Sequence, residues 1–266
     1  MELPFLNNGK MLEGIFTYQL HLMNRYHKMN MIPAWNGLFI DRKDYQAYLR
    51  KLISWITDEL AEASVEFKAA LVETMTPDGL PGGYMHKGSL ELMDAMHFIV
   101  ELMIYSEVDH DDIQDYYAQL TKERNLEIIN FSDGLMSTMA YGRHTNTWDD
   151  QIRVTTFNTV PIELLTQMGR DKLVIPFRVS EELDALRELC MWDVVKAFST
   201  AARYLKNKEW KVTQTQTNVP EYKRQLMIGW LHFGKLLDLC QLEARTAYYL
   251  FEYTNIKNQS RIANGY

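Results

Sequence analysis

Two short acidic pairs carry the chemistry that this sequence suggests. Glu59 and Glu62 lie three residues apart, as do Glu91 and Asp94, and each pair sits in an apolar stretch with helical periodicity. Residues at this spacing share one face of a helix. Carboxylates packed against apolar neighbours are costly unless a cation neutralises them, and beside phosphate that cation is most often Mg²⁺. The sequence therefore predicts a magnesium site, with Mn²⁺ as a possible substitute.

The second pair belongs to a polar stripe on an otherwise apolar segment. From position 90 to 103 the exceptions to apolar character are Glu91, Asp94, His97 and Glu101, spaced as one helix face. A helix that is apolar elsewhere is a buried helix, so the stripe is interpreted as functional. The alternative is that the acids are exposed positions on amphipathic helices, which is the ordinary state of an isolated pair.

Helical periodicity extends over most of the chain and predicts an all-α protein. A loop rich in Pro and Gly at 76–83 separates the acidic segments, so an αα-hairpin would bring the two pairs face to face. The fold expected is an antiparallel helical bundle, with residues 1–266 as one domain. About 126–178 form a central insertion in which 151–160 and 172–179 have β-leaning composition. The predicted helices cover about 10–30, 42–75, 88–106, 110–125, 180–206, 220–239 and 241–262.

Composition excludes several classes of function. The chain has 266 residues, 47% of them hydrophobic, and a net charge of −7, which argues against binding to a nucleic-acid polymer. Cys190 and Cys240 stand alone, without the spacing of a zinc site or a disulfide framework. No apolar run is long enough to span a bilayer, and the first residues do not resemble a secretory signal. A cytoplasmic protein is expected, in the host cytoplasm if a phage encodes it.

The C-terminal segment repeats polar residues at the same spacing. Asn255, Asn258 and Arg261 recur every three residues, and Asn264-Gly265 is suited to ending the helix. Arginine offers a planar fork of donors that fits phosphate. The alternative interpretation is a solvated helix end.

Together these motifs resemble the all-α nucleoside-triphosphate pyrophosphohydrolases, a superfamily that includes MazG-type enzymes. The similarity is greatest to the branch of dimeric dUTPases and phage dCTP/dUTP pyrophosphatases. It rests on the two acid pairs, on His97-Phe98 after the second pair, and on the terminal series that ends in Asn-Gly-Tyr266. It covers about 15–105 and 220–266. The family's lysine falls on Thr254, and the tryptophan usual after the first acid pair is missing from 63–74, so Trp35 is the substitute expected near the base.

The resemblance implies hydrolysis of a deoxynucleoside triphosphate to the monophosphate and pyrophosphate by a homodimer. Glu59, Glu62, Glu91 and Asp94 would hold Mg²⁺. Glu62, assisted by Glu59, would be catalytic, with Glu66 as a second candidate base. The residues implied in phosphate binding are Arg261, Lys257, Tyr266 and Asn258. Those implied in base and sugar binding are Asn24, Gln19, His97, Phe98, Asn255 and Trp35.

Several alternatives stay open at this point. dUTP and dCTP are both plausible substrates, as are a modified pyrimidine and a purine nucleotide. The chain could instead be a helical scaffold or regulatory protein that has lost turnover. A di-iron site is suggested by Asp94-x-x-His97 and Glu107-x-x-His110, but such sites take these pairs from two separate helices.

Overall fold

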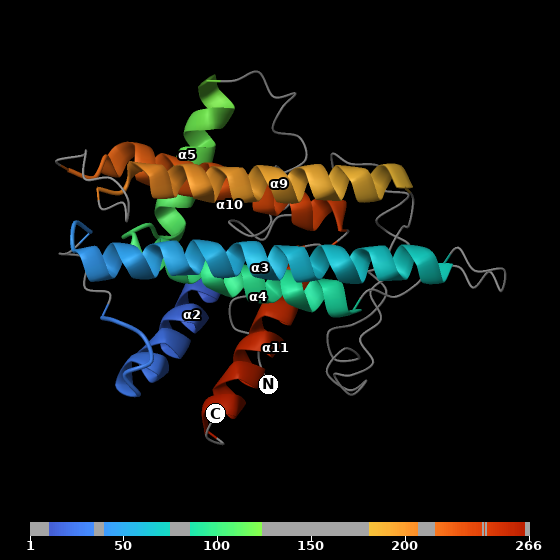
Figure 1. The fold of residues 1–266 in the computed structure, drawn as a ribbon, viewed down its shortest axis with the longest axis horizontal. Coiled ribbons are helices and arrows are strands. Elements are labelled where there is room, and N and C mark those ends of the chain that lie inside the picture. The colour runs from blue at the N-terminus through green and yellow to red at the C-terminus, as the bar shows by residue number, and fades with distance from the viewer. Residues whose placement is uncertain are drawn as a thin grey trace.

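The chain folds into helices throughout the part that can be described. The computed structural model describes residues 11–34, 40–74, 86–123, 181–206, 216–240, 242 and 244–263. Within these ranges there are seven helices and no strand, which confirms the all-α class (Figure 1). The helices are α2 (Met11–Lys28), α3 (Lys43–Thr74), α4 (His86–Tyr105), α5 (His110–Glu123), α9 (Glu181–Tyr204), α10 (Val219–Leu239) and α11 (Ala244–Ala263). The segments 151–160 and 172–179, predicted to lean toward strand, lie outside the described residues.

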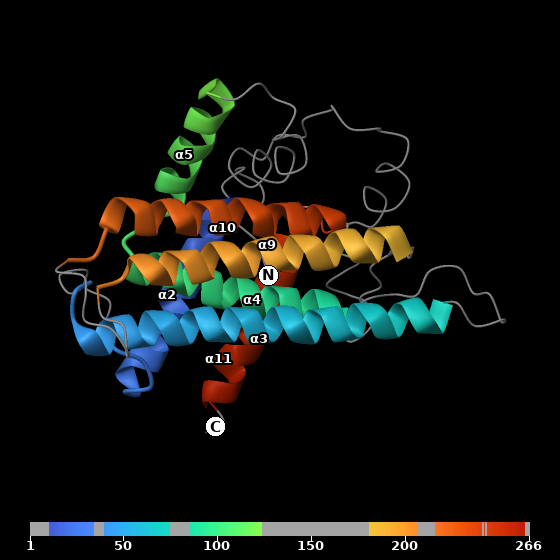
Figure 2. The same cartoon turned by 45° about the horizontal axis from the view of Figure 1, so that its top comes forward.

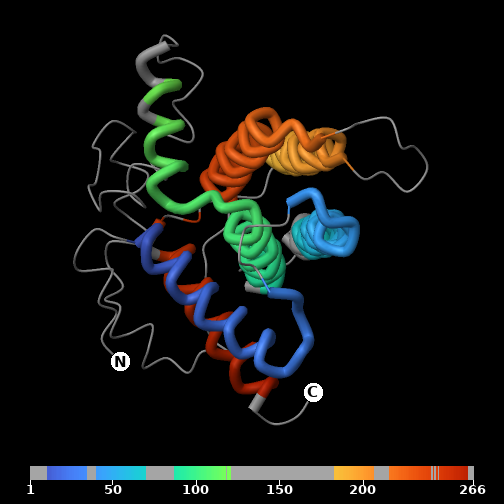
Figure 3. Tube along the Cα trace, turned by 90° about the vertical axis from the view of Figure 1, so that its left-hand side faces the viewer, coloured from blue at the N-terminus to red at the C-terminus, as the bar shows by residue number. Residues whose placement is uncertain are grey.

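Four long helices run alongside one another, and two more cross them. α3 packs against α4 and α9, while α10 packs against α9, with neighbours antiparallel (Figures 1 and 2). α2 and α11 pack together and cross the α4 side of this group (Figure 3). Among the described helices, none has a stretch long and apolar enough to cross a membrane. The arrangement agrees with the antiparallel helical bundle expected from the sequence.

Aromatic contacts fix the register between α3 and α4. The ring centroids of Tyr48 and Tyr105 lie 5.1 Å apart. Trp55 follows Tyr48 by seven residues, Phe98 precedes Tyr105 by seven residues, and their ring centroids are also 5.1 Å apart. Because the helices are antiparallel, the next turn places Glu59 opposite Asp94. The following turn places Glu62 of α3 opposite Glu91 of α4. The packing register therefore positions the two acid pairs face to face.

The composition of α4 explains why its polar residues share one face. Eight of its apolar side chains have no exposed surface, so the helix is enclosed by its neighbours. These are Leu92, Met93, Ala95, Met96, Ile99, Val100, Leu102 and Met103. Polar side chains on such a helix must point to solvent or find partners. The predicted buried helix with a polar stripe is confirmed.

The α9–α10 pair covers the α3–α4 hairpin, with α9 packed against α3 and α10 close to α4 (Figure 3). At the start of α10, the Asn218 side chain accepts a hydrogen bond from the Glu221 amide at 3.4 Å, and Pro220 occupies the first turn. In the middle of the helix, a Cβ on Gly229 would lie 2.7 Å from the Phe198 ring. Glycine at this position therefore lets α9 and α10 approach closely.

Candidate metal centre

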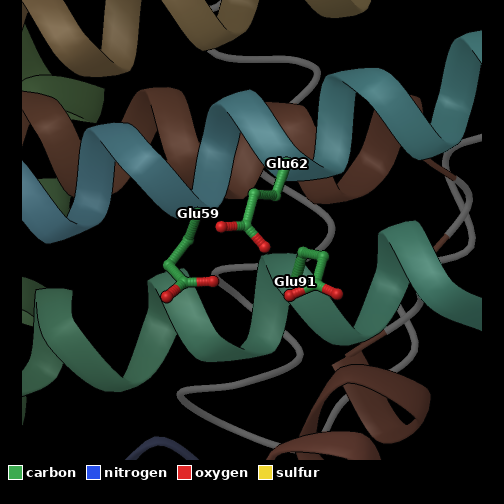
Figure 4. A group of neighbouring side chains, drawn as sticks. All are labelled: Glu59, Glu62 and Glu91. Carbon is green, nitrogen blue, oxygen red and sulfur yellow. The ribbon is translucent and has the colours of Figure 1, made fainter.

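Three carboxylates converge in the space between α3 and α4. Glu59 and Glu62 of α3 and Glu91 of α4 each offer an oxygen atom, and these atoms lie within 4.8 Å of one another (Figure 4). Glu62 is exposed, whereas the other two are half-buried. Carboxylate oxygens are the ligands that Mg²⁺ prefers in proteins. The structure thus brings together three of the four residues predicted to hold a metal.

The fourth predicted ligand, Asp94, lies one turn along α4 and contacts the C-terminal helix. Its half-buried side chain is hydrogen-bonded to Asn258 of α11. Burial raises the pKa of Asp94, and the nearby cations Lys257 and Arg261 oppose that change. Asp94 therefore marks the place where the acids of the hairpin meet the polar face of α11.

Burial and mutual repulsion disfavour the ionised form of the clustered acids. Burial raises the pKa of Glu59 to about 8, and repulsion from Asp94 and Glu62 adds to the effect. The pKa of Glu91 is also raised, first by burial and then by neighbouring acids, while Lys257 opposes the shift. With a pKa of about 8, the Glu59 carboxyl retains its proton near neutrality. A divalent cation could displace that proton and relieve the repulsion, so these side chains fit a metal.

Solvent reaches one end of the cluster through an open surface pocket. The pocket has a volume of about 280 Å³ and is lined by Ala61, Glu62, Val65, Glu66 and Glu91. Two members of the carboxylate cluster and the second candidate base, Glu66, are thus accessible to a solute. Their position allows an anionic ligand to be bridged to the acids by a cation.

Cations of α11 lie near the acids, where the resemblance places phosphate. Lys257 and Arg261 are exposed on the last turns of the helix, and Arg261 Nη1 donates to Asn258 Oδ1 at 3.3 Å. Both cations act on Asp94, and Lys257 also acts on Glu91. Tyr266, the remaining residue predicted to bind phosphate, lies outside the described residues.

Gln19 and His97, predicted to contact the base, meet inside the protein. Their exposed fractions are 1% and 4%, and His97 Nδ1 lies 2.7 Å from Gln19 Oε1. On the other side of the ring, Nε2 lies 2.8 Å from the Thr254 hydroxyl. Burial lowers the pKa of His97 to about 3, so the ring is neutral. Thr254, at the position where the resemblance predicts a lysine, contacts a histidine instead.

The same network contains a buried carboxylate, which the sequence indicates only as a member of the polar stripe on α4. Glu101 is 5% exposed and accepts hydrogen bonds from Gln19 Nε2 at 3.3 Å and from the Tyr48 hydroxyl at 2.7 Å. Burial raises its pKa to about 7, although the two hydrogen bonds oppose the shift. The sequence alone does not indicate the contacts of Tyr48 with Glu101 and of Thr254 with His97, because the two partners lie on different helices.

Beside the acids, α3 and α4 form an aromatic surface. The Trp55 and Phe98 rings lie 5.1 Å apart at 38°, and Lys51 Nζ lies 4.6 Å from the centre of the indole. Trp55 precedes Glu59 by one turn, and Phe98 follows Asp94 by one turn. Both rings are half-buried, so part of each is accessible beside the candidate metal centre.

The other predicted base contacts are placed differently. Asn24 is exposed and donates to the Leu20 carbonyl at 2.9 Å. Asn255 is 1% exposed and donates to the Tyr18 carbonyl at 3.3 Å. Trp35 lies outside the described residues. In the described structure neither asparagine belongs to the carboxylate cluster, and base binding by these residues stays a prediction.

A di-iron centre finds no support in the described residues. His97 is buried in the Gln19 and Thr254 contacts, and His110 Nδ1 lies 3.0 Å from Asp111 at the start of α5. The possible metal-binding group found there contains glutamates only. The acids and histidines of the di-iron hypothesis do not converge.

Comparisons of the chain with protein families, with curated proteins and with solved structures find no match. Only the side chains and their geometry therefore bear on what the protein does. The similarity to the all-α pyrophosphohydrolases rests on the motifs themselves.

Mg²⁺ should raise the unfolding temperature, and more so at about pH 8 than at about pH 5.5. The raised pKa of Glu59, about 8, means that the folded protein binds more protons than the unfolded chain below that pH. Metal-free stability therefore falls as pH rises toward 8, and Mg²⁺ must displace fewer protons there. Thermal unfolding with Mg²⁺ or EDTA across this range tests the prediction. The Glu59→Gln/Glu91→Gln variant is the control, and an equal shift in that variant would contradict the site.

Proposed function

We propose that this protein hydrolyses a deoxynucleoside triphosphate, with dUTP and dCTP favoured, to the monophosphate and pyrophosphate. The observation that carries the proposal is the convergence of Glu59, Glu62 and Glu91 within 4.8 Å across two helices. Lys257 of α11 lies near Glu91, and both Lys257 and Arg261 lie near Asp94. The proposal includes membership of the all-α nucleoside-triphosphate pyrophosphohydrolases, a homodimeric state and a cytoplasmic location.

Glu59, Glu62, Glu91 and Asp94 would hold the metal. Bound Mg²⁺ supplies neutralisation of the triphosphate charge and lowers the pKa of water. The acids fit this role because three of them have pKa values raised by burial and mutual repulsion, which a cation would reverse. Glu62 and Glu91 line the open pocket through which a substrate would reach the metal.

Glu62 is the proposed general base. It is the exposed member of the cluster and lines the pocket, so its carboxylate can take a proton from an attacking water. The half-buried carboxylate of Glu59, opposite Asp94, would help to position the metal beside Glu62. Glu66 lines the same pocket one turn later and is the natural comparison for Glu62.

Lys257 and Arg261 would contact the phosphates. Arginine binds phosphate through paired donors, and the hydrogen bond from Arg261 to Asn258 directs its side chain along α11 toward Asp94. The acids that would hold Mg²⁺ and the cations that would contact the phosphates therefore lie near one another.

The Trp55–Phe98 surface is the proposed contact for sugar and base. It lies one turn from the acids on both helices, and aromatic faces favour stacking with flat rings. His97, directly before Phe98, is buried in the network with Gln19. Because His97 is held in this network, it would help to keep the neighbouring Phe98 in place.

Mg²⁺-dependent release of pyrophosphate from a panel of nucleotides tests the proposal. The panel contains the four common deoxynucleoside triphosphates, dUTP, a 5-methylated dCTP, and the matching ribonucleotides. The proposal expects turnover of dUTP or dCTP with Mg²⁺ and none with EDTA. A purine or modified pyrimidine as the best substrate would keep the reaction and change its specificity. No turnover, with no thermal stabilisation by Mg²⁺ and a non-hydrolysable analogue, would favour the scaffold alternative.

A further inference from the structure

The outer face of α9 exposes large apolar side chains. Leu186, Leu189 and Trp192 have exposed fractions of 50%, 63% and 66%. Their spacing of three residues places them along one stripe of the helix. Isolated exposed apolar residues are ordinary, whereas a contiguous apolar stripe indicates an interaction surface.

This stripe reaches the neighbouring helix beside the carboxylate pocket. α9 runs antiparallel to α3, and Glu188 forms an ion pair with Lys68 of α3 (Figure 2). Trp192 follows Glu188 by one turn on α9, and Val65 precedes Lys68 by one turn on α3. Because the two helices are antiparallel, Trp192 and Val65 lie on the same side of the ion pair. Val65 is 66% exposed and lines the pocket with Glu62. The apolar surface therefore extends to the rim of the candidate metal centre.

The exposed charges described on α9 have opposite signs on the two sides of Trp192. Glu188 precedes it, whereas Lys196 and Arg203 follow it. Asp184 and Asp193, one on each side of Trp192, are half-buried. Two α9 helices in antiparallel contact about a two-fold axis at Trp192 would place Glu188 of each copy opposite Lys196 of the other. An exposed acid of each helix would thus face an exposed base of its partner.

We infer that a second copy of this chain docks on this face, with α9 against α9 and Trp192 at the two-fold axis. Burial of three large apolar side chains per copy supplies the attraction, and the charge order sets the antiparallel direction. This inference specifies the surface for the homodimer included in the proposed function. It also places the partner next to the pocket that Val65 lines.

Molar mass measured by light scattering at several protein concentrations, without nucleotide, tests the surface. The wild-type chain should give twice the mass of one chain, and Trp192→Glu should give the mass of one chain. Met31→Glu is the matched control, because Met31 is 47% exposed and lies away from α9. A monomeric wild type, or a Trp192→Glu variant that stays dimeric with an unchanged circular dichroism spectrum, would overturn the inference.

Charge exchange tests the register. Lys196→Glu and Glu188→Lys should each weaken the dimer, because each creates two like-charged contacts. An equimolar mixture of the two variants should restore a dimer containing one copy of each, in which both contacts are again between opposite charges. Glu188→Lys also replaces the exposed Glu188–Lys68 ion pair with two like charges, a surface change that has little effect on folding. A mixture that stays monomeric would overturn the register, whether or not any nucleotide is hydrolysed.

Discussion

Replacing Glu62 with glutamine should lower the turnover of the best substrate by about three orders of magnitude, within the range for loss of a general base. Glutamine keeps the size of the side chain and one oxygen for a cation, but it cannot take a proton from water at neutral pH. Because Glu62 is exposed, the unfolding temperature should change little. Steady-state kinetics at saturating Mg²⁺, with thermal unfolding of the same sample, measure both effects.

Glu66→Gln is the matched control for that substitution. Glu66 lines the same pocket and has the same side chain, but it is outside the group of three converging carboxylates. Glu66→Gln should lower turnover by less than about a tenth of the factor by which Glu62→Gln lowers it. The reverse order, with Glu66→Gln the more damaging, would transfer the role of base to Glu66. Full activity in both variants would remove this pocket from the reaction.

Much of the fold follows from local pattern. The seven helices in the described ranges begin and end within a few residues of the predicted bounds, because apolar periodicity and loop residues mark them. The hairpin of α3 and α4 follows from the position of the loop at 76–83. Once these helices pack in the register set by Trp55 and Phe98, the acids must face each other.

The rest of the site depends on contacts between distant parts of the chain. Periodicity shows that Asn258 and Arg261 share a helix face, but only tertiary packing places that face beside Asp94. Likewise, the stripe on α4 identifies His97 as polar in an apolar helix without naming its partners. Gln19 and Thr254 reach it from two other helices, 78 and 157 residues away.

Glu101→Gln should reduce the loss of stability that the protein suffers between about pH 5 and pH 8. Burial raises the pKa of Glu101 to about 7, well above its ordinary value of 4.5. In this window the folded state therefore binds more protons at this group than the unfolded state. Stability from the protonated carboxyl is fully present at low pH and is lost as the pH rises through 7. The pKa difference corresponds to about 3 kcal/mol of unfolding free energy for this buried side chain.

The relevant quantity is the difference in unfolding free energy between variant and wild type, measured by urea titration in EDTA at several pH values. Glu59, Glu91 and Asp94 lose protons in both proteins, so their contributions largely cancel in that difference. The difference should shift in favour of Glu101→Gln as pH rises, whatever its value at low pH. Glu107→Gln, at an exposed position beyond the end of α4, should follow the wild type throughout. Parallel curves for Glu101→Gln and wild type would show that Glu101 is already ionised in the folded protein at about pH 5. The hydrogen bonds from Tyr48 and Gln19 would then outweigh burial.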